Sequence, residues 1–325
     1  MGSPATIPFG LPQAGEVLAG RYRVESVIGA GGMGVVVAAS RLDGGGGVAV
    51  KFLTHGSARE PEAGERLIRE ARALASIRSE HVARVYEVGL LPNGAPFMVM
   101  EHLAGTDLGR LRRVHGTFPI ADAVDAILQA GEAVAEAHAL GIVHRDLKPA
   151  NLFVVARPDR SLCVKVLDFG LSKVPAGKVL TMTGLVAGSP QYMAPEQMRS
   201  LKHVDERADI WSLGVILYYL LSGQRPFEGQ SMPVVWANIV AGPPRSLCEI
   251  RPEVSSVLDD VVRRCLAREP EERVRDLAEL AHGLAPFAST RGRTSVDWIR
   301  RALMGGPISG MPGSGPRSRA PGSRR

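Results

Sequence analysis

Cysteine is scarce in this sequence, and its placement argues against both disulfide bonds and a metal centre. Only Cys163, Cys248 and Cys265 occur in the 325 residues, each in an apolar context, and no CxxC spacing is present. Three isolated cysteines make neither a disulfide framework nor a zinc site. We therefore expect free, buried thiols in a reducing compartment, and we predict a cytoplasmic location.

Long apolar runs are missing as well. The longest one, IWSLGVILYYLL at 210–221, has 12 residues, whereas a membrane-spanning helix needs about 20. The N-terminal MGSPATIPFGLPQAG contains neither the basic region nor the apolar core of a secretory signal. The sequence thus predicts a buried helix at 210–221, no transmembrane segment, and a flexible leader rich in Pro, Gly and Ala at 1–20.

Excess charge is absent from most of the chain, although the formal net charge is +6. Residues 287–325 contain eight arginines and a single acid, Asp297, whereas the other 286 residues contain 31 basic and 32 acidic side chains. A nearly neutral body does not have the charge pattern of a nucleic-acid-binding domain, so we expect no nucleic-acid partner. The basic Gly/Pro/Arg-rich segment 287–325 is expected to be a largely disordered tail.

Two regions of different character follow the leader. Up to about residue 103, short runs rich in β-branched residues alternate with turn signals, and one helix at 62–78 interrupts them. After residue 105 the pattern is mostly helical. These features predict an α+β fold in which a small β-rich lobe precedes a larger helical lobe. The expected strands of the small lobe lie at 22–28, 35–40, 48–52, 83–89 and 96–101, and the expected helices of the large lobe at 122–141, 209–222 and 255–267.

A glycine-rich stretch, IGAGGMGVV at 28–36, connects two of the expected strands. A Rossmann phosphate loop would open a helix, whereas the residues after this loop continue as a strand. A hairpin tip without side chains can bring its backbone N–H groups close to phosphate oxygens. The same pattern is typical of a flexible hairpin tip, and the loop alone does not decide between the two.

Two charged residues of the small lobe are candidates for one ion pair. Lys51 ends the strand VAVK, from which it could neutralise phosphate charge. Glu70 lies between Leu67 and Leu74 on the expected helix and therefore faces the core, where a carboxylate needs a partner. Lys51 is the obvious partner; a solvated lysine and a glutamate at the rim of the core are the alternatives.

The segment IVHRDLKPANLFV at 142–154 carries the densest set of reactive side chains. Asp146 can accept a hydroxyl proton, Lys148 can hold a transferring phosphoryl group, and Asn151 can ligate Mg²⁺ through its amide oxygen. Asp168 of VLDFG follows Asn151 by 17 residues. Asn151 and Asp168 together offer the oxygen ligands that suit Mg²⁺ bound to nucleotide phosphates.

The motifs GxGxxGxV, VAVK, HRDLKPAN, DFG and APE occur in this order along the chain. With them the sequence resembles the eukaryotic-type (Hanks-type) protein kinase catalytic domain, and it is closely similar to the bacterial serine/threonine kinases. The resemblance covers residues 22–286, so a kinase domain is expected at 21–286. It implies a bilobal protein-kinase-like fold, phosphoryl transfer from ATP to Ser/Thr hydroxyls of protein substrates, and autophosphorylation. It also implies ATP and Mg²⁺ as cofactors, with Mn²⁺ as an expected substitute.

The site residues of the family carry over to matching positions of this sequence. The resemblance implies that Asp146 is the catalytic base, that Lys148 stabilises the γ-phosphoryl group, and that Lys51 contacts phosphates while Glu70 orients it. It also implies that Asn151 and Asp168 hold Mg²⁺. The residues expected around ATP, including the gatekeeper, the hinge and a ribose-binding acid, are Ile28, Gly29, Ala30, Gly31, Gly32, Met33, Gly34, Val36, Ala49, Lys51, Met100, Glu101, Leu103, Asp107 and Phe153.

Regulatory and structural residues follow from the same resemblance. Arg145 precedes the base and is expected to pair with a phosphate on the activation loop, where Thr181 and Thr183 of LTMTG are the expected phosphosites. Solvated loop threonines are the alternative. Structural roles are implied for the pair Glu196 and Arg273, for Asp209, and for the stack of His144 on Phe169.

Two other functions fit parts of the pattern. A pseudokinase scaffold would have lost one of Lys51, Asp146, Asn151 or Asp168, and all four are present. A small-molecule phosphotransferase of related fold would lack the APE segment, so GSPQYMAPEQ favours a polypeptide substrate. Within the tail, a short helix at 295–304 is expected; docking on the large lobe, contact with a partner or autoregulatory contact, and disorder are its three alternatives.

Overall fold

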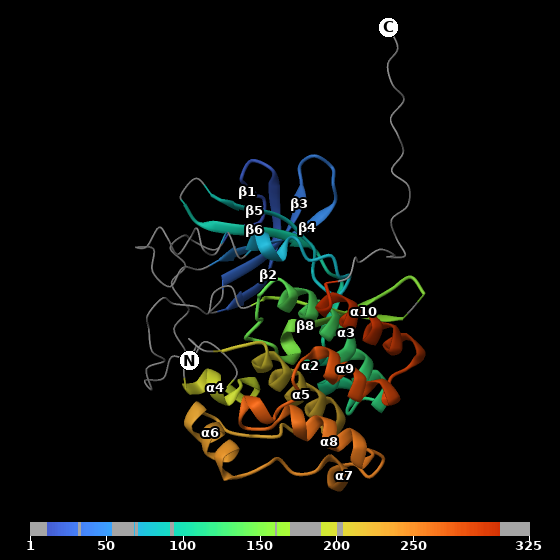
Figure 1. The fold of residues 1–325 in the computed structure, drawn as a ribbon. Helices are drawn as coiled ribbons and strands as arrows, with labels where there is room; N and C mark the ends of the chain where they lie inside the picture. The colour runs from blue at the N-terminus through green and yellow to red at the C-terminus, as the bar shows by residue number, and fades with distance from the viewer. Residues whose placement is uncertain are drawn as a thin grey trace.

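The computed structural model describes residues 12–31, 34–53, 68, 71–91, 94–159, 161–169, 190–199 and 204–305. Two lobes stand one above the other, a β-rich one from the first part of the chain and a helical one from the rest (Figure 1). This is the predicted α+β arrangement of a small and a large lobe.

The small lobe is built on a six-stranded antiparallel sheet in the order β1-β2-β3-β4-β6-β5. Its strands are β1 (Val17–Leu18), β2 (Tyr22–Gly31), β3 (Gly34–Arg41), β4 (Gly47–Leu53), β5 (Val85–Leu90) and β6 (Pro96–Glu101). Alternation divides their side chains between two faces. Val37, Val50 and Val99 are buried in one apolar cluster, whereas Ala49 and Met100 belong to a second. The five strands expected for this lobe are therefore confirmed as β2 to β6.

Part of the expected helix 62–78 lies outside the described residues. Residues 71–74 are helical, and Ala71 and Leu74 are buried. Ala71 packs with Ala49 and Met100 on the second face of the sheet. Leu74 instead joins the core of the large lobe, so this helix end contacts both lobes.

The large lobe consists of helices packed around one central helix. Its helices are α2 (Leu108–His115), α3 (Ile120–Ala139), α4 (Pro195–Arg199), α5 (Arg207–Ser222), α6 (Met232–Ala241), α7 (Leu247–Ile250), α8 (Ser256–Cys265), α9 (Leu277–Leu284) and α10 (Thr290–Leu303). α5 is buried on nearly all sides, as its uniformly apolar sequence predicts. A small three-stranded sheet, β7 (Gly105–Asp107), β8 (Leu152–Ala156) and β9 (Leu162–Val166), faces the small lobe.

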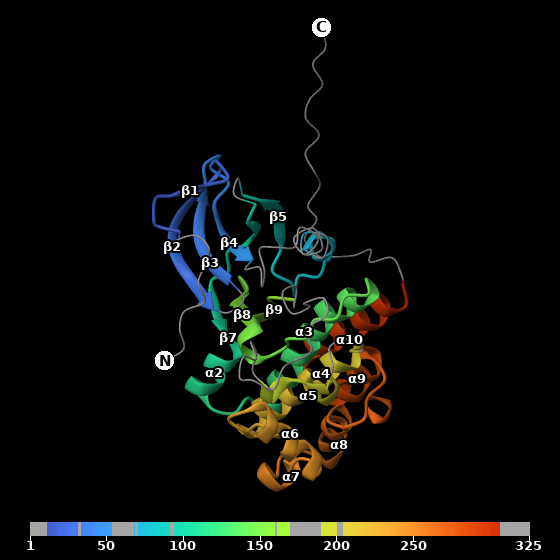
Figure 2. The same cartoon turned by 90° about the vertical axis from the view of Figure 1, so that its left-hand side faces the viewer.

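The C-terminal helix differs from the sequence-based expectation. α10 begins at Thr290, not at residue 295, so the folded part continues through much of the segment expected to be a disordered tail. It lies along α3 in both views (Figure 1, Figure 2), and Ile299 is buried against Gly131 of that helix. Ser289 caps α10 and is bound in turn by Asp125 of α3. These supports come from residues far away in sequence, which is why periodicity alone did not predict the start of the helix.

Two expectations drawn from scarce features can be compared with the structure. Cys163, Cys248 and Cys265 are free thiols, as predicted; Cys163 and Cys265 are buried, but Cys248 is only half-buried, so the expected burial is wrong there. Across the described residues, no helix combines the length and the apolar character that crossing a membrane requires.

Candidate active site

The loop between α3 and β8 brings the predicted catalytic residues together. The Lys148 ammonium Nζ lies 2.9 Å from the Asp146 carboxylate Oδ2. The Asn151 amide Nδ2 donates to the backbone carbonyl of Asp146 at 2.8 Å, closing the loop as a short 3₁₀ turn at Pro149–Asn151. The three side chains that the sequence places close together are thus in contact.

Asp209, in the first turn of α5, fixes this loop through hydrogen bonds to its backbone. Its carboxylate accepts the backbone N–H groups of His144 and Arg145, each at 2.8 Å, and a bond from His138 Nε2 at 2.8 Å. Burial opposes ionisation of Asp209, yet the hydrogen bond and charge of His138 keep its pKa below the ordinary value. An ionised carboxylate in the core therefore fixes the backbone just before Asp146.

His144 links the catalytic loop to the segment that carries Asp168. Its Nδ1 accepts the backbone N–H of Asp146 at 3.2 Å, so Nε2 carries the proton and donates to the Leu167 carbonyl at 3.0 Å. Burial lowers the pKa of His144, which favours this neutral form. The ring packs on Phe169 with 4.6 Å between centroids, the contact that the resemblance implies.

Two residues of the site adopt a left-handed backbone that side chains disfavour. Arg145 has φ 63° and Asp168 has φ 54°. Each such residue costs about 1–3 kcal/mol and persists only where neighbouring contacts fix it. At Arg145 these contacts are the N–H bond to Asp209 and a bond from Gln197 Nε2 to the Arg145 carbonyl at 3.0 Å.

Lys51 crosses from the small lobe to Asp168. Its Nζ lies 2.6 Å from Asp168 Oδ1, and the lysine is buried to 6% exposure. Glu70, the partner predicted from the sequence, lies outside the described residues. The lysine that was expected to face phosphate thus meets the carboxylate that was expected to face Mg²⁺.

Most of the expected nucleotide-binding residues lie on β2, β3, β4 and β6 or just after them, whereas Asp107 and Phe153 lie on β7 and β8 of the small sheet. The glycine stretch is the end of the β2–β3 hairpin, with Gly29 opposite Val36 and Gly31 opposite Gly34; residues 32 and 33 lie outside the described part. Ala49 is paired with Met100 across β4 and β6, and both are buried. The remaining positions are Ile28, Ala30, Leu103 and Phe153, which are exposed or half-buried.

The hinge positions make contacts that the sequence did not predict. The Glu101 carboxylate pairs with Lys165 of β9 at 2.8 Å, and its backbone N–H donates to the Arg84 carbonyl. Asp107, expected to bind ribose, caps α2 by accepting the Arg110 N–H at 2.8 Å. An acid directly before a helix is a typical N-cap, a signal that would have predicted this role.

The donor set near Asp168 fits a hard cation bound to phosphate. Because the Asn151 NH₂ group is committed to Asp146, its amide oxygen is the atom suited to ligate a metal. The Leu167 N–H donates to the Asn151 carbonyl at 2.8 Å, which ties this residue to the segment of Asp168. Within the described ranges no three His, Cys, Asp or Glu gather as a metal site, so a zinc-type centre has no support there.

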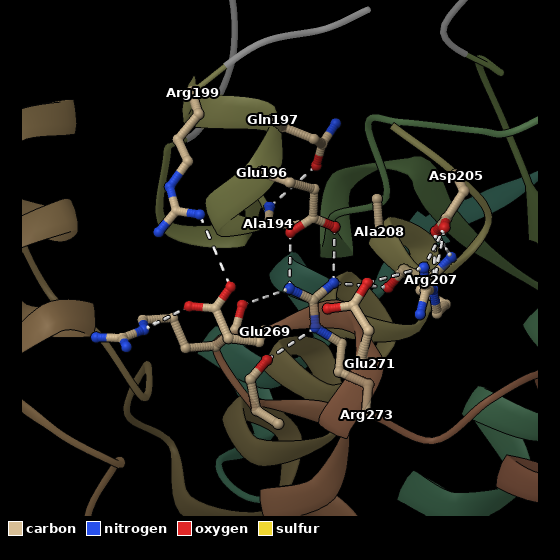
Figure 3. A network of polar contacts seen from close by, with 12 residues as sticks. Ala194, Glu196, Gln197, Arg199, Asp205, Arg207, Ala208, Glu269, Glu271 and Arg273 are labelled. Atoms are coloured by element: carbon tan, nitrogen blue, oxygen red, sulfur yellow. Dashed lines mark hydrogen bonds and ion pairs between the residues drawn. The ribbon is translucent and has the colours of Figure 1, made fainter. Parts of the chain in front are cut away.

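A buried ion pair anchors the segment that follows residues 170–189. Arg273 binds Glu196 through two bonds of 2.7 Å and donates its other N–H groups to the carbonyls of Ala267, Arg207 and Arg268 (Figure 3). All five guanidinium donors are thus satisfied, which a buried charge requires. This is the contact that the resemblance implies for Glu196 and Arg273.

A family model described as the protein kinase domain matches residues 22–283. The chain belongs to this protein kinase family. It is 38% identical over 282 residues to the serine/threonine-protein kinase Pkn1 of Myxococcus xanthus, covering 86% of this chain and 40% of Pkn1. It is 37% identical over 311 residues to the serine/threonine-protein kinase PknB of Mycolicibacterium smegmatis, covering 91% and 48% of the two chains.

Solved structures agree with this assignment. The kinase domain of PknI from Mycobacterium tuberculosis superposes with a TM-score of 0.65 at 26% identity, covering 86% of this chain and all of that one. The chain spans less than half the length of the two curated relatives above.

One contact of the kinase site was missed by sequence reasoning. Gln197 is 1% exposed; it accepts the Ala194 N–H at 2.9 Å and donates to the Arg145 carbonyl. It therefore joins the APE segment to the catalytic loop. No periodicity or motif rule distinguishes this glutamine from a solvated one.

The expected regulatory residues are only partly described. Arg145 has a buried Nε with no hydrogen-bond partner in the part of the chain that the structure describes. Thr181 and Thr183 lie outside the described residues.

Proposed function

We propose that this chain is a protein serine/threonine kinase that transfers the γ-phosphoryl group of ATP to Ser or Thr hydroxyls. The supporting observation is the convergence of Lys51, Asp146, Asn151 and Asp168 from separate segments, held by Asp209 and His144. Each of these residue types suits one requirement of phosphoryl transfer.

Asp146 and Lys148 suit the transfer itself. The Asp146 carboxylate would accept the proton of the attacking hydroxyl. Lys148, whose Nζ lies beside that carboxylate, would place positive charge where negative charge develops on the phosphoryl oxygens. The backbone bonds from Asp209 would keep both groups in position during the reaction.

Lys51 and the β2–β3 hairpin suit the binding of ATP. Lys51 would contact phosphates, and the hairpin backbone would cover them while Val36, Ala49 and Met100 enclose the base. Bound Mg²⁺ would neutralise part of the phosphate charge. Asn151 and Asp168 are the residues that would hold it. To do so, Asp168 would leave its ion pair with Lys51, in which its side chain is only partly buried.

Two observations favour protein substrates and an active enzyme. The segment 190–199, a docking platform for a peptide in our proposal, is fixed by Arg273 and Gln197. A pseudokinase is disfavoured because each residue needed for transfer is present. The free thiols agree with a reducing, cytoplasmic location, which stays a prediction.

Autophosphorylation is proposed as the regulatory step. The buried Nε of Arg145, which has no hydrogen-bond partner among the residues described, lies next to the base and is a suitable receptor for a phosphate on Thr181 or Thr183. A phosphate bound there would order the loop that precedes the APE segment.

The direct test is incubation of the purified chain with labelled ATP, Mg²⁺ and a generic acceptor protein, followed by mapping of the labelled residues. Label on Ser and Thr is the expected result, with autophosphorylation at Thr181 or Thr183. Absence of any transfer would contradict the proposed activity. Transfer with no loss of rate in a Thr181→Ala/Thr183→Ala double variant would contradict the regulatory step alone.

A further inference from the structure

Three arginines surround two tyrosines beside the catalytic loop. Arg112 and Arg113 belong to α2, and Arg225 follows α5. The tyrosines are Tyr219 of α5 and Tyr192 of the turn before the APE segment. We refer to the three arginines as the arginine cluster.

The position of Arg113 connects the cluster with the active site. A β-carbon at Gly109 would lie 3.3 Å from the Pro149 Cβ and 3.6 Å from the Arg113 Nη1. Pro149 belongs to the same loop as Asp146 and Lys148. The guanidinium of Arg113 thus lies close to Pro149, the residue that follows Lys148.

Arg225 connects the cluster with the peptide-docking segment. Its Nε donates to the Tyr192 hydroxyl at 3.3 Å, and its guanidinium carbon lies 5.8 Å from the centres of both tyrosine rings. Burial raises the pKa of Tyr192, and the positive charges of Arg225 and Arg113 oppose that rise, so both charges act at this hydroxyl. Tyr192 lies four residues before Glu196, which is anchored by Arg273.

Arg112 lies over the ring of Tyr219. Its guanidinium carbon lies 5.2 Å from the Tyr219 ring, and its Nε is buried without a hydrogen-bond partner among the described residues. It occupies the space above Gly223, where a β-carbon would come within 1.7 Å of its Nη2. Gly223 also has φ 79°, so this position strongly favours glycine, and glycine leaves room for the arginine.

No direct ion pair neutralises the cluster among the described residues, although the Asp107 carboxylate lies near Arg113: a β-carbon at Gly109 would be 3.0 Å from its Oδ1. Among the described residues, no carboxylate oxygen lies within 4.0 Å of any of its three guanidinium groups. Elsewhere in the large lobe, arginines such as Arg207 and Arg273 are paired with acids. Glu228 is the acid whose charge reaches Arg225, and it is itself exposed.

We propose that the arginine cluster binds an anionic side chain of the protein substrate, so that acceptor Ser or Thr residues flanked by an acid are preferred. This inference rests on the proposed kinase function. Guanidinium groups bind carboxylates and phosphates through paired hydrogen bonds, and the contacts of Arg112 and Arg225 with the tyrosine rings restrict the motion of these two arginines before the substrate arrives. A carboxylate and a phosphorylated side chain share this chemistry.

Peptide kinetics test the proposal. Acceptor peptides carrying Asp, phosphoserine, Ala or Arg at each position on either side of the acceptor are compared by kcat/KM. The wild-type chain should favour an acidic or phosphorylated peptide over its Ala counterpart by about tenfold at one or more positions. The Asp and phosphoserine arms tell a carboxylate preference from a phosphate preference.

Variants assign the preference to the cluster. In Arg113→Gln/Arg225→Gln the ratio of acidic to neutral kcat/KM should fall towards one, and Arg225→Glu should favour the Arg-containing peptides. Arg275→Gln, a change at an 81% exposed arginine side chain before α9, should keep the wild-type ratio. No acidic preference in the wild type, or an unchanged ratio in the double variant, would overturn the proposal.

A binding measurement separates this proposal from the kinase function. Fluorescence anisotropy of labelled acidic and neutral peptides reports recognition without any transfer. Tighter binding of the acidic peptide that is lost in Arg113→Gln/Arg225→Gln supports the cluster even if no phosphate is transferred, in which case only the kinase proposal fails. Equal binding of both peptides by a chain that does transfer phosphate would overturn the cluster proposal alone.

Discussion

Asp209 illustrates how one buried residue determines the geometry of a site above it. Its carboxylate accepts both backbone N–H groups that precede Asp146, and one of them belongs to Arg145 in its left-handed conformation. These bonds oppose relaxation of the strained backbone. We therefore treat Asp209 as a positioning residue, since it acts on Asp146 through the loop.

Asp209→Asn should lower kcat while changing the KM for ATP little. An amide offers one acceptor oxygen where the carboxylate offers two, so one backbone N–H group loses its partner and the loop shifts. A displacement of about 1 Å at a catalytic group can lower the rate about 100-fold, so a fall in kcat of about 10- to 100-fold is expected. Steady-state kinetics check this split, with the exposed Asp260→Asn as the control. Equal kcat in wild type and Asp209→Asn would show that the loop does not need this support.

Glu132 on α3 is a half-buried acid whose titration should affect stability. Its carboxylate lies 3.6 Å from His81 Nε2 and is bonded to Ser295 of α10. Burial raises its pKa from the ordinary 4.5 to about 7. Between these values the folded chain keeps a proton that the unfolded chain has released, so stability falls as pH rises. Burial lowers the pKa of His81 to about 4, so the contribution of His81 to stability rises with pH. This rise is complete near pH 6.5, the ordinary pKa of histidine.

Glu132→Gln should therefore stabilise the fold more at pH 8 than at pH 5. Glutamine keeps the shape and the bond to Ser295, and it removes the ionisation. One pKa unit corresponds to about 1.4 kcal/mol, so the gain in unfolding free energy between the two pH values is on the order of 2–3 kcal/mol. Urea denaturation at both pH values measures it, and Glu253→Gln at an exposed position should show no such difference. A gain of the same size at both values would mean that Glu132 does not titrate in this range.

At the scale of elements, α10 extends the kinase body beyond residue 283, where the family match ends. Three kinds of contact hold it on the lobe. Ile299 is buried against Gly131, Ser289 is bound by Asp125, and Arg291 pairs with Asp159 of the β8–β9 turn at 2.9 Å. The helix is therefore a packed part of the large lobe.

Ile299→Ala should reduce the unfolding free energy by about 2–5 kcal/mol, the range seen when a large apolar side chain is truncated in a core. The side chain is 1% exposed, and no larger residue at position 131 is available to fill the space. Val257→Ala, at a 59% exposed position of α8, provides the control and should change stability by less than about 0.5 kcal/mol. A similar, small effect of both variants would argue against the packing of α10.

Elements with a clear period could be predicted from the sequence, whereas contacts between distant segments could not. The alternation of Val48, Val50 and the residues between them predicted β4, and the apolar stripe of 122–141 predicted most of α3. The start of α10 depends on Asp125, more than 160 residues earlier, which no local pattern encodes. The same reason explains why the bonds of Gln197 and the pairing of Lys51 with Asp168 were missed.

At the scale of the whole molecule, the site exists only where the two lobes meet. Lys51 comes from the sheet of the small lobe, whereas Asp146, Asn151 and Asp168 come from loops of the large lobe. Leu74 and Val82, from the small lobe's side of the junction, are packed into the core of the large lobe. Binding of a nucleotide would therefore depend on groups from both lobes, whereas the proton-accepting carboxylate depends on one.

This division makes Asp146→Asn the most direct test of the account. The change removes the proposed proton acceptor and leaves the groups proposed for nucleotide binding in place. We predict that the Kd for ATP with Mg²⁺, measured by calorimetry, changes less than about threefold, because the interaction of Asp146 with ATP is not needed for binding. In the same preparation, transfer of labelled phosphate to an acceptor protein should fall at least about 100-fold, since a lost general base removes that much rate or more. Retained transfer by Asp146→Asn would contradict the account.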